Sequence, residues 1–214
     1  MSDSASDTLG DALRRFEIEL PDDQAARAER YCRLLWEWNE RLNLTRHTDF
    51  DKFVSRDLVD SLELSRLLAT DEKVLDVGTG GGVPGIVLGI IRPDLQMSLC
   101  ESVGKKAQAV ETMVRELNLP SPVYRDRAES VVDARRFDAL VARAVGPLWK
   151  ICTWFKSHWH RFDRLLAVKG PRWVEERREA RERGLLKNVE LRKAAAYPMP
   201  GTNSESVILK LRGK

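Results

Sequence analysis

The sequence predicts an α/β fold: a Rossmann-like, mostly parallel seven-stranded sheet with helices on both faces, an antiparallel C-terminal hairpin and an N-terminal helical cap. Three observations predict it. An apolar run, a glycine cluster and a segment of helix-spaced apolar residues follow one another within residues 74–90. Short apolar runs then alternate with helical patterns as far as residue 168, which is typical of a parallel sheet. Two extended runs close the chain and are expected to pair antiparallel.

Residues 1–70 are predicted to form the helical cap, and residues 71–214 the sheet domain. No linker rich in proline, glycine or serine separates them, so we expect the cap to be fused to the sheet domain. Helical spacing of apolar side chains marks residues 3–20, 22–42 and 50–68. In the third helix we expect Phe53, Val54, Leu58, Leu62 and Leu67 to face inward and Arg56, Asp57, Asp60 and Ser61 to lie on or near the other faces.

The predicted strands and one charged segment follow from local pattern. Residues 172–183 interleave both charge signs at helical spacing, which favours a solvated surface helix. Strands are expected at residues 74–77, 97–101, 122–124, 137–142, 164–168, 189–195 and 206–211.

Composition describes a globular protein. Of 214 residues, 43% are hydrophobic and 32% charged, and no apolar run approaches the roughly 20 residues that span a bilayer. The N-terminus is acidic and polar, unlike a secretory signal, so we expect a cytoplasmic protein without a membrane partner. Cys32, Cys100 and Cys152 are scattered, which indicates reduced core residues and neither a disulfide framework nor a metal site.

Charge is distributed unevenly along the chain. Residues 1–72 hold 10 lysines and arginines against 17 acidic residues, whereas residues 73–214 hold 26 against 16. A basic sheet domain favours a polyanionic partner, and nucleic acid is the obvious candidate.

The glycine cluster predicts a ligand-binding turn between a strand and a helix. Gly78, Gly80, Gly81 and Gly82 follow the apolar run directly, and glycine lets a backbone adopt positive φ and approach a ligand closely. Such a turn places the ligand at a helix N-terminus. A Gly-x-Gly-x-x-Gly pattern alone does not identify that ligand.

Two carboxylates favour S-adenosylmethionine (SAM) over a dinucleotide. Val83 occupies the place of the third fingerprint glycine, and Asp76 ends the strand where it would repel a pyrophosphate but suit a cationic ammonium group. Glu101 follows 25 positions later at the end of the next apolar run, where it can accept hydrogen bonds from both ribose hydroxyls. The order of these features, Asp-x-Gly-x-Gly-x-Gly followed by a strand and then an acidic residue, resembles that of class I SAM-dependent methyltransferases.

The carboxyl ends of parallel strands meet at one edge of a sheet, so polar residues that follow the strands are expected to converge there. We expect the Gly78–Val83 backbone to approach the methionine part of SAM and Glu101 to bind the ribose. Ala128 and Glu129 would border the adenine, and Arg143 would reach the SAM carboxylate or the substrate. Lys169 ends the fifth strand at the same edge.

The residues also restrict the methyl acceptor. The loop after the fourth strand, ARAVGPLW, lacks the Asn/Asp-Pro-Pro-aromatic sequence used for exocyclic amines. Cys152 lies in an apolar helical run and looks inert, which disfavours pyrimidine C5 methylation. With exocyclic amines and pyrimidine C5 disfavoured, the sequence favours a methyl acceptor that already has a free lone pair, such as a purine ring nitrogen.

Several motifs together resemble the RsmG (GidB) family of bacterial 16S ribosomal RNA guanine-N7 methyltransferases. They are Asn43-Leu44-Thr45, Asp60-Ser61, the Asp76–Gly85 turn, Glu101-Ser102, Lys105-Lys106, Arg127, Glu129, Arg143-Ala144 and Lys169-Gly170. The resemblance implies a class I fold, with SAM as the methyl donor. The implied substrate is a guanine in the decoding-region loop of the 16S RNA of the small ribosomal subunit. We expect the protein to act as a monomer. The resemblance also implies SAM contacts at Gly78, Val83, Ala128, Glu129 and Arg143, with Arg143 and Lys169 bordering the guanine as the catalytic pair.

Two departures from the family pattern leave alternatives open. Asp57 stands where the family usually has histidine, and residues 203–206 lack the hairpin arginine that it tends to carry. Both changes are expected to make the substrate side less attractive to phosphate. The alternatives are a SAM-binding, RNA-contacting protein with altered target or lost catalysis, a methyltransferase of small molecules or proteins, and, remotely, a nicotinamide oxidoreductase.

Overall fold

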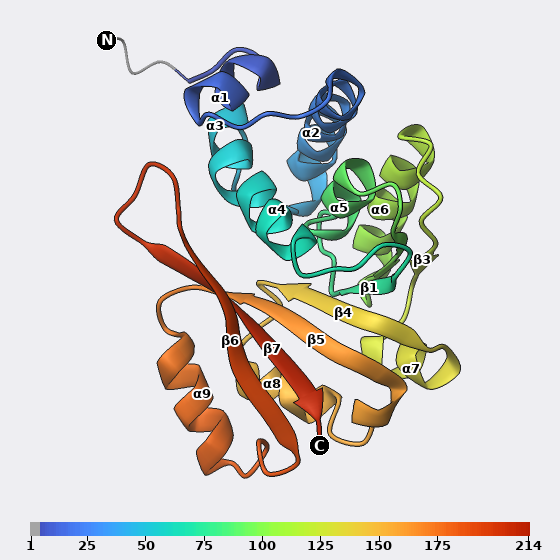
Figure 1. The fold of residues 1–214 in the computed structure, drawn as a ribbon. Helices are drawn as coiled ribbons and strands as arrows, with labels where there is room; N and C mark the ends of the chain where they lie inside the picture. Colours follow the sequence, from blue (N-terminus) through green and yellow to red (C-terminus); the bar gives the residue numbers. More distant parts are fainter. Residues whose placement is uncertain (1–4) are drawn as a thin grey trace.

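The computed structural model describes residues 5–214 and contains the predicted seven-stranded sheet (Figure 1). The strand order is β3-β2-β1-β4-β5-β7-β6. The five strands from β3 to β5 run parallel, and β7 pairs antiparallel with both β5 and β6. The bounds are β1 Lys73–Val77, β2 Gln96–Cys100, β3 Val123–Tyr124, β4 Phe137–Arg143, β5 Phe162–Lys169, β6 Val189–Pro198 and β7 Glu205–Gly213. The predicted fold class is therefore confirmed.

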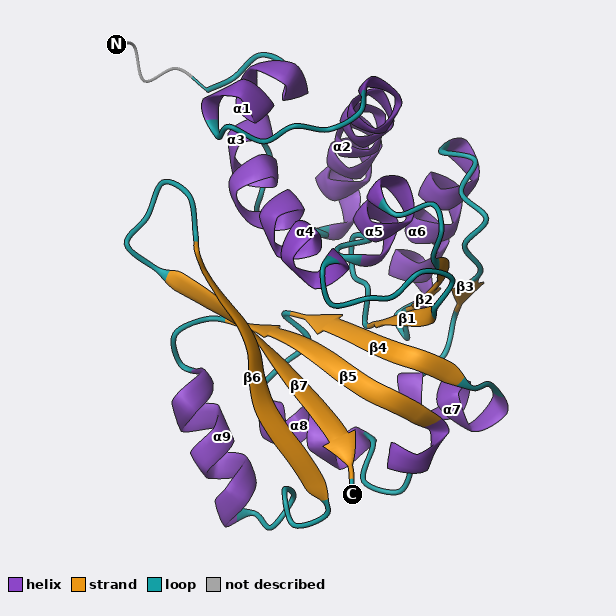
Figure 2. Cartoon of the chain, in the orientation of Figure 1, coloured by secondary structure: helices purple, strands orange, loops and turns teal. Residues whose placement is uncertain are grey.

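Helices cover both faces of the sheet, as predicted (Figure 2). The first predicted helix is shorter than residues 3–20, and residues 3 and 4 lie outside the described part of the chain. One face carries α1 Leu9–Arg15, α2 Asp22–Leu42, α3 Phe50–Lys52, the π-helical turn η1 Phe53–Leu58, α4 Val59–Ser65, α5 Gly85–Ile91 and α6 Gly104–Glu116. The other face carries α7 Ala128–Ala134, α8 Leu148–Trp154 and α9 Trp173–Glu182, and the short η2 Trp159–Arg161 precedes β5.

Alternation along the strands divides the interior into two cores. Val74 and Val141 pack with the helices of the first face, whereas Leu75 and Leu140 pack with α7 and α8. Successive side chains of a strand point to opposite faces, so a parallel strand buried on both sides reads as one apolar run. The first core also contains buried residues of α1, α2 and α4. The division of the chain at residue 70 stays a prediction.

The face assigned to part of the third predicted helix is wrong. Phe53, Val54 and Leu58 are buried as expected, but so are Asp57 and Asp60, at 1% and 5% exposure, together with Ser61. The carboxylates meet a buried arginine of β4, which compensates the cost of their burial. That long-range contact is absent from the local sequence pattern.

The predictions of buried cysteines and of a surface helix at residues 172–183 are confirmed. The three cysteines are buried and free. Helix α9 contains one buried residue and several ion pairs, such as the one between Arg183 and Glu179, as predicted for a solvated helix. Among residues 5–214, no helix combines the length and apolar character needed to cross a membrane.

Candidate functional site

The glycine turn adopts the conformation expected of a ligand-binding loop. Gly78, Gly80 and Gly82 have φ of +65°, +59° and +106°, a region that L side chains rarely adopt. A Cβ at Gly80 would meet nothing closer than the Gly78 carbonyl, at 3.9 Å, so the backbone there borders open space. A Cβ at Gly82 would lie 2.6 Å from Ile86 Cδ1. Gly80 thus leaves room beside the turn, whereas Gly82 lets it pack on α5.

Asp76 fastens this turn from below. Its Oδ2 accepts hydrogen bonds from the Thr79 hydroxyl and from the Gly85 N–H, the latter at 2.8 Å. The side chain is fully buried, and its Oδ1 has no hydrogen-bond partner. Desolvation raises the pKa of Asp76 to about 6 despite the hydrogen bonds from Thr79 and Gly85, which lower it. The carboxylate therefore sits at the base of the turn, and a role toward a ligand stays a prediction.

Glu101 secures the turn from the side. Its two carboxylate oxygens accept the N–H of Gly80 at 3.1 Å and that of Val103 at 2.8 Å. Both are backbone donors, so the carboxylate stays at the mouth of the turn while its side chain lines the adjacent cavity. β1 and β2 are neighbouring parallel strands, which brings their carboxyl ends together as expected.

Three cavities lie in succession along the carboxyl edge of the sheet. The first, of about 640 Å³, includes Gly78, Ala128 and Glu129 in its lining. The second, of about 460 Å³, shares Gly78 with the first and includes Gly80, Val83 and Glu101. The third, of about 360 Å³, shares Arg143 and Ala144 with the second and includes Lys169. Apart from buried Asp76, every predicted site residue lines at least one of them.

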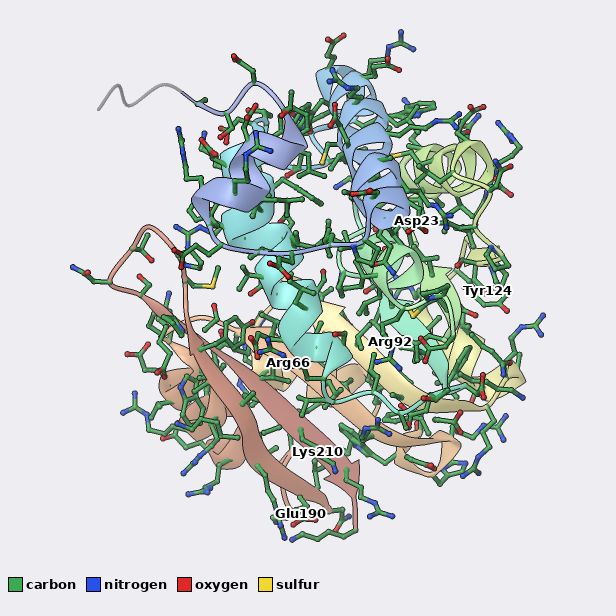
Figure 3. The ribbon with its side chains drawn as sticks, turned by 45° about the horizontal axis from the view of Figure 1, so that its top comes forward. Asp23, Arg66, Arg92, Tyr124, Glu190 and Lys210 are labelled. Atoms are coloured by element: carbon green, nitrogen blue, oxygen red, sulfur yellow. The ribbon has the colours of Figure 1, made fainter. Side chains whose placement is uncertain are left out.

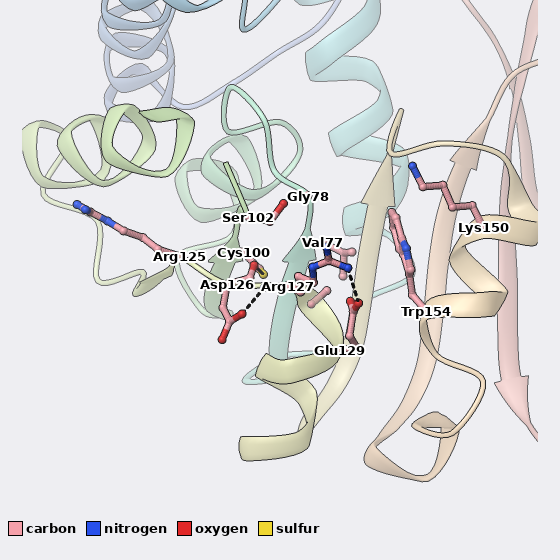
Figure 4. Close-up of a pocket in the computed structure, with 11 residues that line it drawn as sticks. Val77, Gly78, Cys100, Ser102, Arg125, Asp126, Arg127, Glu129, Lys150 and Trp154 are labelled. Atoms are coloured by element: carbon pink, nitrogen blue, oxygen red, sulfur yellow. Dashed lines mark hydrogen bonds and ion pairs between the residues drawn. The ribbon is translucent and has the colours of Figure 1, made fainter. Parts of the chain in front are cut away.

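The first cavity has walls that the sequence did not suggest. Trp154 and Lys150, from α8, lie across it from Cys100 and Asp126 (Figure 4). The Lys150 ammonium stands 5.4 Å from the centre of the Trp154 ring, a cation–π contact. Glu129 forms a long ion pair of 3.9 Å with Arg127 at the rim. An aromatic side chain and acidic groups thus face each other across this cavity.

Arg143 is held by carboxylates from the helical layer. Its Nη2 lies 2.5 Å from Asp57 Oδ1 and its Nε lies 3.1 Å from Asp60 Oδ2. His47 Nδ1 lies 2.8 Å from Asp57 Oδ1, and the Tyr197 hydroxyl donates to Asp60 Oδ1 at 2.7 Å. Desolvation lowers the pKa of Arg143, but Asp57 and Asp60 together raise it above the ordinary value. The guanidinium is therefore fixed in place and charged.

The same network surrounds the Asp57 carboxylate. The carboxylate is 1% exposed and lies between the Arg143 guanidinium and His47, so its charge is compensated internally. His47 and Asp57 line the second cavity, yet neither was assigned a site role from the sequence. The Asn43-Leu44-Thr45 motif that precedes His47 was the available signal.

Lys169 lies at the far end of the series. Its ammonium donates to the Gly146 carbonyl at 2.6 Å and pairs with Glu176 at 2.8 Å, and 8% of the side chain is exposed. Glu176 also accepts the N–H of Leu148. This ammonium therefore ties β5 to α8 and α9 while it lines the third cavity.

Comparisons with known proteins show which family the sequence matches. The family model described as rRNA small subunit methyltransferase G matches residues 24–200. A ribosomal RNA small subunit methyltransferase G of Rhodopirellula baltica is 51% identical over 188 residues, which cover 88% of this chain and 81% of the relative. One from Pseudomonas putida is 30% identical over 211 residues, covering 98% of this chain and 95% of the relative.

Solved structures support the fold. A MtNAS variant in complex with S-adenosylmethionine has a TM-score of 0.56 at 16% identity and covers 94% of this chain and 82% of that chain. A precorrin-6y C5,15-methyltransferase from Geobacter metallireducens has a TM-score of 0.53 at 14% identity, covering 72% of this chain and 87% of that chain. From the family model and the sequence relatives together, this chain belongs to the rRNA small subunit methyltransferase G family.

Proposed function

We propose that this chain transfers a methyl group from SAM to N7 of a guanine in 16S ribosomal RNA of the small subunit. The observation that carries the proposal is the series of three cavities joined at Gly78 and at Arg143. Two adjoining cavities suit the two halves of the donor, and the third offers the acceptor a place beside Arg143. The sequence relatives, which are ribosomal RNA small subunit methyltransferases, supply the substrate class.

The residues present fit SAM. The Gly80 backbone borders open space that a Cβ would enter, and each of the two cavities beside the turn falls in the size range of small-molecule sites. Gly78, Gly80 and Val83 would hold the methionine part above Asp76, Glu101 the ribose, and Ala128 with Glu129 the adenine. When bound, the sulfonium supplies an electrophilic methyl group. The chain's own task is to hold a nucleophile in line with it.

The third cavity favours an acceptor that carries no proton at its reacting atom. Four titratable side chains line it, and all four are in ion pairs: Asp60 with Arg143, and Glu176 with Lys169. Neither carboxylate is free to act as a general base. Guanine N7 has an in-plane lone pair and needs none, so positioning suffices. Arg143 and Lys169 would border the base.

We further propose that the chain acts as a monomer in the cytoplasm, where its ribosomal substrate is assembled. Among the described residues, the large apolar side chains with more than half of their surface exposed are Val103 and Val174, at 52% and 54%. They belong to different elements, α9 for Val174 and the start of α6 for Val103. Scattered exposed residues of this kind do not form the contiguous patch that an obligate interface needs.

The test is incubation with radiolabelled SAM and small ribosomal subunits from cells that lack this protein. We expect one methyl group per subunit, mapped to N7 of a single guanine, and less transfer as salt rises because cations compete for phosphate. Absence of label at any enzyme concentration, with SAM still bound in calorimetry, would leave a binding role. Salt-insensitive transfer to a small molecule would replace RNA as the substrate.

A further inference from the structure

The exposed end of the C-terminal hairpin carries a charged cluster that the proposed site does not use. It consists of Glu190 and Arg192 on β6 and Lys210 and Arg212 on β7, which together line a shallow cavity of about 220 Å³. We name these four residues the hairpin cluster. Three are cationic and one is anionic, so the cluster has a net positive charge.

The register places all four side chains on one face of the sheet. Arg192 is directly opposite Lys210, and Glu190 is directly opposite Arg212. Their neighbours Leu191 and Leu211 point to the opposite face and pack against the core around α8. Side chains directly across an antiparallel pair are close neighbours, so these four form one continuous charged surface.

The helical layer does not cover this surface. Ile208, two residues before Lys210 on the same face, is fully buried in the first core, whereas Lys210 and Arg212 are exposed. Figure 3 shows Lys210 and Glu190 on the near side of β6 and β7, with no helix drawn over them. The cluster is therefore open to a large partner.

The charges of the hairpin cluster are only partly neutralised within the fold. Like charges directly across a strand pair are destabilising, and Arg192 and Lys210 form such a pair. Arg192 is ion-paired with Glu190, but within the described residues neither Lys210 nor Arg212 forms an ion pair. By contrast, Arg164 of the neighbouring strand β5 is neutralised by Glu72 at 2.7 Å. An anionic partner would relieve the repulsion between Arg192 and Lys210.

We propose that the hairpin cluster binds the phosphate backbone of the substrate RNA, outside the cavity that takes the target base. Lys210 pairs with Leu166, three residues and thus about 10 Å along β5 from Lys169, which ends that strand at the carboxyl edge. The two side chains point to opposite faces of the sheet, so an RNA that reaches both has to pass over that edge. Arginine and lysine on a sheet face form charge-assisted contacts to phosphates that position a nucleic acid without reading its sequence. This inference rests on the proposed function and adds a second contact area to it.

Reversing the charge of Lys210 tests the proposal, because RNA affinity should fall while the melting temperature should not. Lys210→Glu creates an opposite-charge pair with Arg192, so the melting temperature should be equal or higher. Affinity for unmethylated 16S RNA should fall on the order of tenfold at low salt, and the slope of log affinity against log salt should become about one unit shallower. SAM affinity in calorimetry should be unchanged.

Arg14→Glu is the matched control, because Arg14 is an exposed cation on α1, at the far end of the molecule from the hairpin cluster (Figure 1). It should leave RNA affinity at the wild-type value. Equal RNA affinity of Lys210→Glu and wild type, with wild type still labelling the RNA, would overturn the inference and leave the proposed function standing. Loss of binding to assembled subunits but not to naked RNA would overturn it in favour of a ribosomal protein. Failure of the wild type to label any RNA would overturn the proposed function and the inference together.

Discussion

At the scale of single residues, the buried Asp76 carboxylate holds the glycine turn but lowers the stability of the fold when it is ionised. Asp76 is fully buried, and desolvation raises its pKa from 3.8 to about 6. A carboxyl group whose folded pKa is raised stabilises the fold fully below its unfolded pKa, and this contribution is lost as pH rises through the folded pKa. At pH 7 the ionised group therefore costs about 3 kcal/mol, from roughly 1.4 kcal/mol per unit of pKa.

We predict that Asp76→Asn removes this pH dependence. The amide oxygen can still accept from Gly85 and Thr79, so the turn should keep its shape. The melting temperature of the variant relative to wild type should rise between pH 4 and pH 7, because the wild type alone has to ionise a buried group. Thermal unfolding across that range measures it. A constant difference at all pH values would show that Asp76 does not titrate near pH 6.

Arg143 couples the site to the fold, so its removal should affect both. In Arg143→Ala, Asp57 and Asp60 lose the cation that compensates their burial. Breaking a buried pair by removing one partner costs about 3–5 kcal/mol, so the variant should unfold at a clearly lower temperature at pH 8. Burial raises the pKa of Asp60, and the positive charge of Arg143 opposes that rise. Without Arg143, the variant should therefore regain stability as pH falls and the Asp60 carboxylate is protonated.

Arg143→Lys is the control, since it keeps a cation beside both carboxylates but loses the planar fork. It should remain folded at pH 8 and bind SAM more weakly than wild type. Calorimetry at pH 8 separates the two effects. Wild-type SAM affinity in this variant would remove Arg143 from the donor site while leaving its structural role intact.

At the scale of elements, the glycines of the turn have two different roles: Gly80 leaves room for a ligand, and Gly82 allows the turn to pack on α5. We predict that Gly80→Val abolishes SAM binding while the protein still folds at a lower melting temperature, because its side chain would enter open space. A φ of +59° costs an L residue about 1–2 kcal/mol, and it costs a β-branched residue more. Gly82→Ala should instead lower the melting temperature further, since its Cβ would lie 2.6 Å from Ile86 and 3.2 Å from the Tyr31 hydroxyl. Paired melting curves and SAM titrations distinguish them. Full SAM affinity in Gly80→Val would exclude this backbone from the donor site.

The elements themselves could largely be predicted from the sequence because their signals are local. The apolar run before Gly78 and the helical spacing after Gly82 lie within a few residues of the structure that they specify. The cavity-lining residues on strand ends followed from the sheet topology. The inward placement of Asp57 and Asp60 could not be predicted in this way, because it depends on an arginine about 80 positions away in sequence. Trp154 was missed for the same reason: its role as a cavity wall depends on how α8 packs.

At the scale of the whole molecule, the N-terminal helices are part of the site as well as of the core. Buried residues of α1, α2 and α4 belong to the same cluster as those of α5, α6 and one face of the sheet. Leu35, Leu44 and Asp57 line the second cavity. A sheet domain without these helices would expose the part of the first core that they cover and leave Arg143 without its carboxylates.

We therefore predict that the fragment 71–214 does not fold cooperatively, although the sequence pattern divides the chain at residue 70. Apolar surface contributes about 25 cal/mol per Å² buried, and the fragment would keep α5 and α6 but lose the buried residues of α1, α2 and α4 that pack with them in the first core. Its near-ultraviolet circular dichroism should lack fixed tryptophan signals, and SAM should not bind in calorimetry. The full chain, with its intact first core, is the control. A cooperative melting transition of the fragment with measurable SAM affinity would mean that the helical cap is a separable appendage, and that the carboxylates on Arg143 are dispensable for holding the donor.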